Sequence, residues 1–143
     1  MWIGIDPGES GGIAIIEDTS NGVLVMSQKL DATEADVSEF LERCGSSAKF
    51  CLIEKVGATP QMGVVSAFTF GRSFGFLIGL LTAHKIPFDF VTPQKWQKSM
   101  GCLTGGDKNV SKGAAQRLFP SVKMTHANAD SILLAEHCRR THP

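Results

Sequence analysis

The sequence predicts an α/β fold, in which a five-stranded mixed sheet is covered by helices. Two observations predict it. The first 30 residues hold apolar runs separated by strong turn signals, which is typical of a meander of antiparallel strands. Farther along, short apolar runs alternate with longer helical patterns, an order that favours parallel strands. The 143 residues are enough for one domain with its own core, and we expect that domain to span residues 1–143.

The first three strands are expected at residues 2–6, 12–17 and 22–29. The first apolar run ends at Asp6, and Pro7-Gly8 then favours a tight turn before the second run begins. Asn21-Gly22, between two apolar runs, is a dipeptide that favours a two-residue β-hairpin. These three strands should therefore be antiparallel to one another.

The first helix is expected over residues 33–44. Thr33 and Asp36 match the capping-box pattern at its start. Gly45 follows its end, at the place where glycine is favoured. The helix should therefore be short, with both ends defined by local sequence.

The rest of the chain alternates between strands and helices. We expect a strand at 49–55, a helix at 64–85, a strand at 88–91, a short helix from Pro93, and helices at 108–118 and 127–140. Pro87 ends the long helix, and Pro93 suits the first turn of a helix that carries Trp96. The fourth and fifth strands should run parallel to the first.

Charge is unevenly distributed along the chain, although the formal net charge is zero. Residues 1–84 carry ten acids and five bases, whereas residues 85–143 carry four acids and nine bases. The two parts therefore carry net charges of −5 and +5. Such asymmetry favours a polyanionic partner on the second part, although scattered surface charge gives the same count.

Cysteine and hydropathy patterns indicate a soluble intracellular protein. The four cysteines form no C-x-x-C pair, which favours free thiols in a reducing compartment over disulfides or zinc. The most apolar stretch, at 64–81, is rich in glycine and contains Arg72, and we expect it to be too polar for a membrane span. We therefore expect a protein of the cytoplasm, or of an organelle after removal of a targeting segment, with no membrane partner.

Three acids stand at the ends of predicted elements. Asp6 and Glu54 each end an otherwise apolar strand, and Asp130 lies near the start of the last helix. Singly, such an acid is more often a turn former or a helix cap. Buried together, the three repel one another unless cations lie between them. Divalent ions roughly 3.5–4 Å apart fill this role in two-metal phosphodiester sites, and oxygen ligands favour Mg²⁺ or Mn²⁺.

A series of motifs runs from one end of the chain to the other. Gly4-Ile5-Asp6-Pro7-Gly8 opens it, with Gly11-Gly12-Ile13-Ala14 and then Ile53-Glu54-Lys55-Val56. Later segments are Phe70-Gly71-Arg72-Ser73-Phe74-Gly75, Val91-Thr92-Pro93-Gln94-Lys95-Trp96-Gln97-Lys98, Ala115-Gln116-Arg117-Leu118-Phe119-Pro120 and Ala129-Asp130-Ser131-Ile132-Leu133-Leu134-Ala135-Glu136. The ordered set resembles the RuvC-type resolvases, in particular their phage-type and organellar branch, within the RNase H-like superfamily.

The resemblance implies an RNase H-like fold, a homodimer, and Mg²⁺-dependent paired nicking of four-way (Holliday) DNA junctions. By position, Asp6, Glu54 and Asp130 match the metal-binding acids of the family. Many relatives carry a fourth acid where this chain has Ala127, and others place a histidine or an acid at the position of His126. His126 precedes Asp130 by four residues, so both share one face if the helix already runs there. We therefore assign His126 as a metal ligand or water-orienting group; the alternative is a weakened site.

Several basic residues in the second part of the chain are candidates for DNA contact. They are Lys95, Lys98, Lys108, Lys112 and Arg117. Such side chains neutralise backbone phosphates, which fixes the position of the DNA without reading its sequence. Lys112 is the best single candidate for a phosphate contact. Trp96 lies between two of these lysines, and both core packing and stacking on a base are open to it.

Small residues recur every four positions along the predicted long helix. The stripe comprises Gly63, Ala67, Gly71, Gly75, Gly79 and Ala83. Glycine costs a helix roughly 1 kcal/mol per residue relative to alanine, so a close approach to another element is the expected gain. That element is either the protein's own sheet or a second copy, and the resemblance favours a dimer interface at Gly71, Gly75 and Gly79.

The sequence leaves two alternatives to junction cleavage. Ala127, in place of the acid of many relatives, favours a junction-binding protein without catalysis. A related RNase H-like nuclease that acts on RNA or on other branched DNA also fits, because a two-metal site does not depend on the shape of its substrate. Metal-dependent nicking of a synthetic junction distinguishes them.

Overall fold

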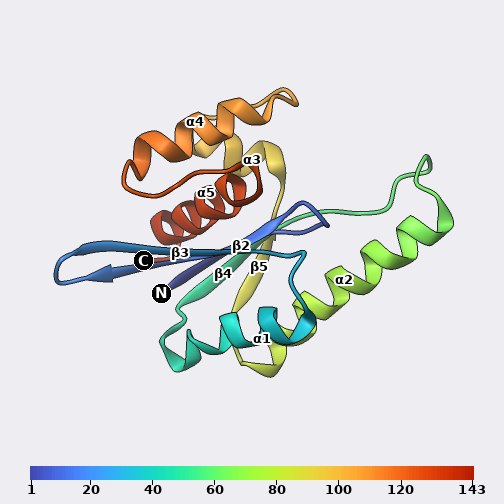
Figure 1. The fold of residues 1–143 in the computed structure, drawn as a ribbon, viewed down its shortest axis with the longest axis horizontal. Helices are drawn as coiled ribbons and strands as arrows, with labels where there is room; N and C mark the ends of the chain where they lie inside the picture. The colour runs from blue at the N-terminus through green and yellow to red at the C-terminus, as the bar shows by residue number, and fades with distance from the viewer.

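The computed structural model describes all residues, 1–143, and has a five-stranded sheet at its centre (Figure 1). The strands are β1 (Trp2–Asp6), β2 (Gly12–Thr19), β3 (Gly22–Lys29), β4 (Phe50–Glu54) and β5 (Phe88–Val91). They lie in the order β3-β2-β1-β4-β5. The first three are antiparallel, and β1, β4 and β5 run parallel, as the sequence predicts.

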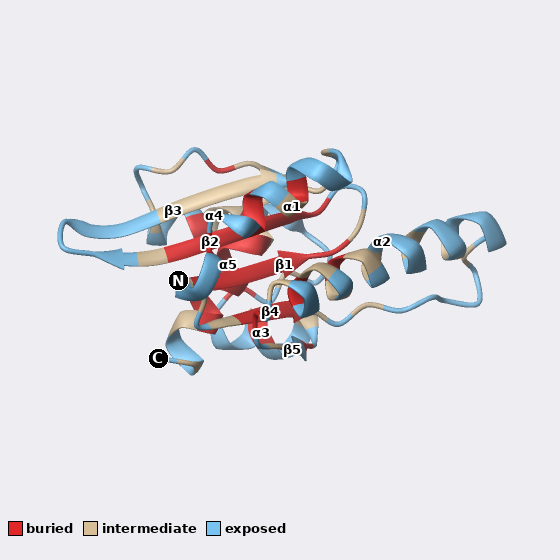
Figure 2. Cartoon of the chain, turned by 90° about the horizontal axis from the view of Figure 1, so that it is seen from below, coloured by how far each residue is buried: buried red, intermediate tan, exposed pale blue.

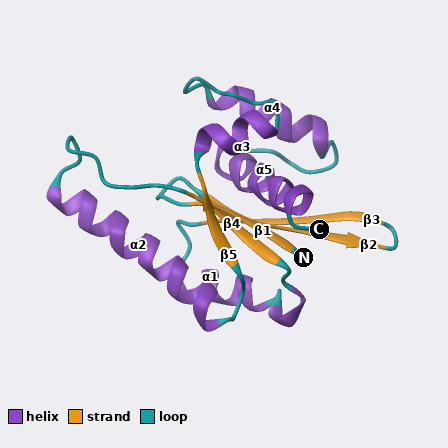
Figure 3. Cartoon of the chain, turned by 180° about the vertical axis from the view of Figure 1, so that it is seen from behind, coloured by secondary structure: helices purple, strands orange, loops and turns teal.

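Five α-helices cover the two faces of this sheet (Figures 1 and 3). They are α1 (Glu34–Glu42), α2 (Val64–Ala83), α3 (Pro93–Ser99), α4 (Lys108–Leu118) and α5 (His126–Thr141), with a short 3-10 helix at Gly45–Ser47. Helices α1 and α2 pack on one face, and α3, α4 and α5 lie over the other. The predicted α/β fold is confirmed.

Strand β1 is buried along its whole length, between two hydrophobic clusters (Figure 2). Trp2 belongs to the cluster under α5, whereas Ile3 and Ile5 belong to the cluster under α1 and α2. Successive side chains of a strand point to opposite faces, so a strand covered on both faces is apolar throughout. Asp6, at its end, is therefore a carboxylate carried by the most buried strand of the fold.

Helix α5 lies directly on the sheet because two strand positions are glycine. A Cβ on Gly4 of β1 would collide with the backbone of Ser131 and Ala135. A Cβ on Gly12 of β2 would collide with the carbonyl oxygen of Ala127. With no side chain between helix and strands at these points, the first half of α5 is fixed over the end of β1.

The ends of two helices differ from the prediction for local reasons. Helix α5 begins at His126, one residue early, because Thr125 caps it and forms a capping box with Asn128. Helix α2 ends at Ala83, two residues before the expected end at Lys85. Lys85 has a φ of +56°, in the left-handed region where a helix cannot continue.

Helix α2 projects from the rest of the molecule at its N-terminal end (Figures 1 and 3). Val64, Val65 and Phe68 are 87%, 79% and 75% exposed, and only Leu77 and Leu81 are buried. By length and composition this helix is apolar enough to cross a membrane, so the expectation that it is too polar was wrong. Its first half presents an apolar surface that nothing in this chain covers.

Candidate active site

Two acids lie side by side at the carboxyl ends of the neighbouring parallel strands β1 and β4. The parallel strands β1 and β4 pair as far as Ile5 and Ile53, and the next residues are Asp6 and Glu54. Because parallel strands end at the same edge, both carboxylates leave the sheet together. Asp130 reaches the same region from α5, which rests on β1.

The carboxyl of Asp6 is buried and crowded by other acids. Its residue is 9% exposed, and burial raises its pKa to about 7, with repulsion from Glu54 and then Asp130 adding to the shift. Lys108 acts in the opposite direction on this pKa. The fold thus brings the three predicted acids within electrostatic reach of one another, with one cationic side chain near them.

Glu54 is partly buried and has one hydrogen bond to a side chain. Burial raises the pKa of its carboxyl, the hydrogen bond from Trp96 lowers it, and Asp130 raises it further. The indole Nε1 of Trp96 donates to Oε2 of Glu54 at 2.7 Å. Trp96 is fully buried, so core packing is confirmed for it and stacking on a base is excluded. Its bond to Glu54 joins residues 42 positions apart, and no pattern in the sequence indicated it.

Asp130 has a buried carboxylate oxygen, Oδ1, with no hydrogen-bond partner. An unpartnered buried oxygen is costly, and a divalent cation is one ligand that offsets the cost. No group of three His, Cys, Asp or Glu side chains lies close enough to enclose an ion alone. The three acids offer the oxygen ligands that Mg²⁺ prefers, and Mg²⁺ usually keeps several waters and is bound through only one or two carboxylates.

His126 lies at the first position of α5, and its side chain is exposed. Its Nε2 atom lies 3.0 Å from Oδ1 of Asn109 on α4. The residue also lines a cavity of about 370 Å³ together with Lys108 and Glu9. The histidine therefore shares a cavity with Lys108, but none of the three acids lines that cavity, so the structure does not bring His126 into contact with them. Its ring is oriented by an amide that the sequence did not single out.

The five basic side chains that are predicted to contact DNA lie on two helices, α3 and α4, and differ in their distance from the acids. Lys108 affects the pKa of both Asp6 and Glu54, so it is the base that faces the acids. Lys112 follows it by one turn on α4 and is partly buried. Lys95 and Lys98 are exposed on α3, and Arg117 is exposed on α4. Lys108 is thus the one of the five that the structure brings near the acids, while the other four lie elsewhere on α3 and α4.

The predicted glycine stripe lies on the outer side of α2. Gly71, Gly75 and Gly79 are exposed, and a Cβ on any of them would meet nothing within 4 Å. Packing of these glycines on the protein's own sheet is therefore wrong. Of the two interpretations of the stripe, only contact with another molecule stays a prediction.

No family model and no curated protein matches the sequence. Solved structures match it in three dimensions. Thermus thermophilus RuvC superposes with a TM-score of 0.66 over 98% of this chain and 96% of that chain, at 15% identity. RuvC of the same organism in complex with a Holliday junction substrate gives 0.66 over 97% and 94%, at 14% identity.

A third match is the yeast mitochondrial Holliday junction resolvase Ydc2. It superposes with a TM-score of 0.52 over 96% of this chain and 77% of that chain, at 16% identity. At identities this low, the superpositions establish a common fold and nothing beyond the fold. The chain therefore has the fold that Thermus thermophilus RuvC and the yeast resolvase Ydc2 share.

Proposed function

We propose that this protein is a structure-selective endonuclease that resolves four-way (Holliday) DNA junctions by paired, metal-dependent hydrolysis of phosphodiester bonds. The observation that carries the proposal is the meeting of Asp6, Glu54 and Asp130 at one edge of the sheet, with one buried carboxylate oxygen unpartnered. Carboxylates that raise each other's pKa favour a bound cation over an empty site. The fold shared with RuvC, which has been solved with a junction substrate, supports the choice of DNA.

Asp6, Glu54 and Asp130 hold Mg²⁺ in this proposal, with Mn²⁺ able to replace it and His126 as a further ligand or water-orienting group. The bound ions supply the activation of water and the stabilisation of the leaving oxygen. Before DNA binds, Lys108 offsets part of the repulsion among the acids. Asn109 restrains the imidazole of His126, and restraint of a ligand ring by a neighbour is common at metal sites.

Lys95, Lys98, Lys108, Lys112 and Arg117 are proposed to bind the phosphate backbone of the junction. All five lie on α3 or α4; α3 carries Trp96, which is hydrogen-bonded to Glu54, and α4 begins with Lys108, which lies within electrostatic reach of Asp6. Their contacts neutralise phosphates and hold the scissile strand against the carboxylates. This arrangement accounts for the excess of bases in the second part of a chain whose net charge is zero.

The active form is proposed to be a homodimer that forms through α2. The exposed face of this helix combines Val64 and Phe68 with Gly71, Gly75 and Gly79, and nothing in the chain covers it. Large uncovered apolar patches favour association, and glycines let two helix backbones approach closely. A second copy suits a junction, because a two-fold dimer presents one site to each of two strands.

A nicking assay tests the proposal directly. Purified protein is incubated with a four-way junction, a linear duplex or a single strand of the same sequences, with Mg²⁺ or with EDTA. We expect paired nicks in the junction only, and only with Mg²⁺. Junction binding without cleavage in Mg²⁺ or Mn²⁺ would favour the non-catalytic alternative that Ala127 suggests. Equal cutting of all substrates, or of RNA, would favour the other nuclease alternative.

A further inference from the structure

The one side chain that holds Glu54 by a hydrogen bond is Trp96. Its indole Nε1 lies 2.7 Å from Oε2, the length of a strong bond to a charged acceptor. Oε1 of the same carboxylate accepts no hydrogen bond within the chain. An indole N–H only donates, so this contact stabilises the carboxylate without competing for a cation. The two carboxylate oxygens of Glu54 therefore differ: Oε2 is held by the protein, and Oε1 has no partner in the chain.

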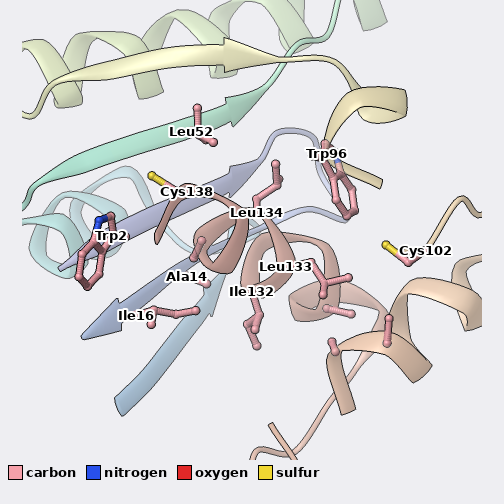
Figure 4. Packing of buried hydrophobic residues seen from close by; sticks show 14 of the residues in the cluster. Trp2, Ala14, Ile16, Leu52, Trp96, Cys102, Ile132, Leu133, Leu134 and Cys138 are labelled. Carbon is pink, nitrogen blue, oxygen red and sulfur yellow. The ribbon is translucent and has the colours of Figure 1, made fainter. Parts of the chain in front are cut away.

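Trp96 is itself held rigidly. It is fully buried in the hydrophobic cluster under α5, beside residues such as Leu133, Leu134 and Cys102 (Figure 4). The helix that carries it is short, but Thr92 caps its start with a side-chain acceptor and is followed by proline. A close-packed indole has no free rotation, so the direction of its N–H bond is set by the core.

We propose that Trp96 is a positioning residue for the metal site: its N–H fixes Oε2 of Glu54 and leaves Oε1 free to bind the divalent cation. The inference rests on the proposed function and adds to it a link between the hydrophobic core and the acidic cluster. Neighbours that orient a ligand typically contribute 10–100-fold to metal affinity. Without the N–H, Glu54 loses a defined orientation, and repulsion from Asp130 is no longer opposed by a fixed donor.

Trp2 provides a matched control within the same cluster. It is 4% exposed, and its Nε1 also donates a hydrogen bond, to the carbonyl oxygen of His142 at 2.6 Å. It lies at the opposite end of the cluster from Trp96 (Figure 4). Trp2→Phe and Trp96→Phe therefore remove the same chemical group from the same core, but only the second touches an acid of the site.

The test measures binding of Mn²⁺ alone, by calorimetry without DNA, together with thermal unfolding in EDTA. We expect both variants to lose stability, whereas Trp96→Phe alone weakens Mn²⁺ binding, by at least tenfold. Wild-type Mn²⁺ affinity in Trp96→Phe, or an equal loss in Trp2→Phe, overturns the inference while leaving the proposed function intact. Failure of the wild-type protein to bind Mn²⁺ overturns the proposed function itself.

A second measurement keeps the inference testable if Trp96→Phe does not fold. In Trp2→Phe, Trp96 is the only tryptophan of the chain, so its fluorescence reports on one indole. Titration with Mg²⁺ should shift its emission, because the carboxylate that accepts its hydrogen bond becomes neutralised. The same titration of Trp2→Phe carrying Glu54→Gln should leave the emission unchanged. Unchanged emission in both proteins while Mg²⁺ binds contradicts the inference.

Discussion

Gly4 of β1 lies so close beneath Ala135 of α5 that any side chain on Gly4 would collide with the Ala135 backbone nitrogen. The contact joins backbone to backbone, so neither partner can move away by changing a rotamer. It fixes the distance between strand and helix, and with it the distance between Asp6 and Asp130. The packing that brings Asp130 close to Asp6 therefore requires a residue without a side chain at position 4 of β1.

Gly4→Ala should lower the free energy of unfolding by about 3 kcal/mol or more, because it overpacks a backbone contact. Urea unfolding measures the change. Gly57→Ala is the control, since a Cβ there meets nothing within 4 Å and its φ is not left-handed. Equal stability of the two variants would contradict the close packing of α5 on β1.

Asp6→Asn should abolish Mg²⁺-dependent nicking while junction binding persists, because it removes one charge from the metal site. It should also change the pH dependence of stability in EDTA. The pKa of Asp6 is about 7 in the fold against 3.8 for a free carboxyl, so ionising Asp6 destabilises the wild-type fold. This penalty is absent below about pH 4 and complete above pH 7, where it reaches about 4 kcal/mol.

Unfolding of both proteins at pH 4, 6 and 8 checks that sign. Asp6→Asn should be more stable than wild type at pH 8, and its advantage should shrink as the pH falls toward 4. Added Mg²⁺ should stabilise the wild-type protein and have little effect on the variant. A variant that cuts junctions at the wild-type rate would show that Asp6 is not in the site.

His126→Ala should reduce nicking strongly, and His126→Asp should restore part of it, since either a neutral imidazole or a carboxylate can bind the metal. Asn109→Ala should have a smaller effect, because it frees the ring without removing it. Single-turnover nicking rates at saturating enzyme separate these cases. Wild-type nicking rates in His126→Ala would show that His126 has no role in cleavage and is only the first residue of α5.

Lys112→Ala should weaken junction binding and reduce its dependence on salt, because one fewer counterion is released. Its melting temperature should hardly change. Arg43→Ala is the control: Arg43 is exposed at the end of α1, on the opposite face of the sheet. Electrophoretic mobility shifts at several salt concentrations give the slope, and an unchanged slope would mean that Lys112 faces away from DNA.

Gly75→Leu should convert the dimer into a folded monomer that no longer makes paired nicks. A bulky side chain holds two helix backbones apart, whereas in one chain it has open space and improves helix propensity. Sedimentation and a melting curve give both results. Ala35→Leu, at an exposed position of α1, controls for added apolar surface. A Gly75→Leu protein that stays dimeric would mean that the stripe contacts something else, such as a membrane or another protein.

The sequence alone determined the parts of this protein that depend on neighbours in the chain. Turn dipeptides and caps located the strands and most helix ends, and an acid at the end of an apolar run marked Asp6 and Glu54. Because parallel strands end at one edge of a sheet, placing those two strands was enough to bring the two acids together. Asp130 became the third candidate acid because it lies near the start of the last predicted helix.

Only the tertiary structure decided which residues meet across elements. Trp96 and Glu54 are 42 residues apart, and local pattern carries no information on the direction of an indole N–H bond. Likewise, the glycine spacing of α2 does not tell whether the glycines face the protein's own sheet or the solvent. In the structure Leu77 and Leu81 are buried, and the glycines lie on the exposed side of the helix. Local sequence fixes dihedral angles and periodicity, but the partner of a face is set by the free energy of burying it against the whole chain.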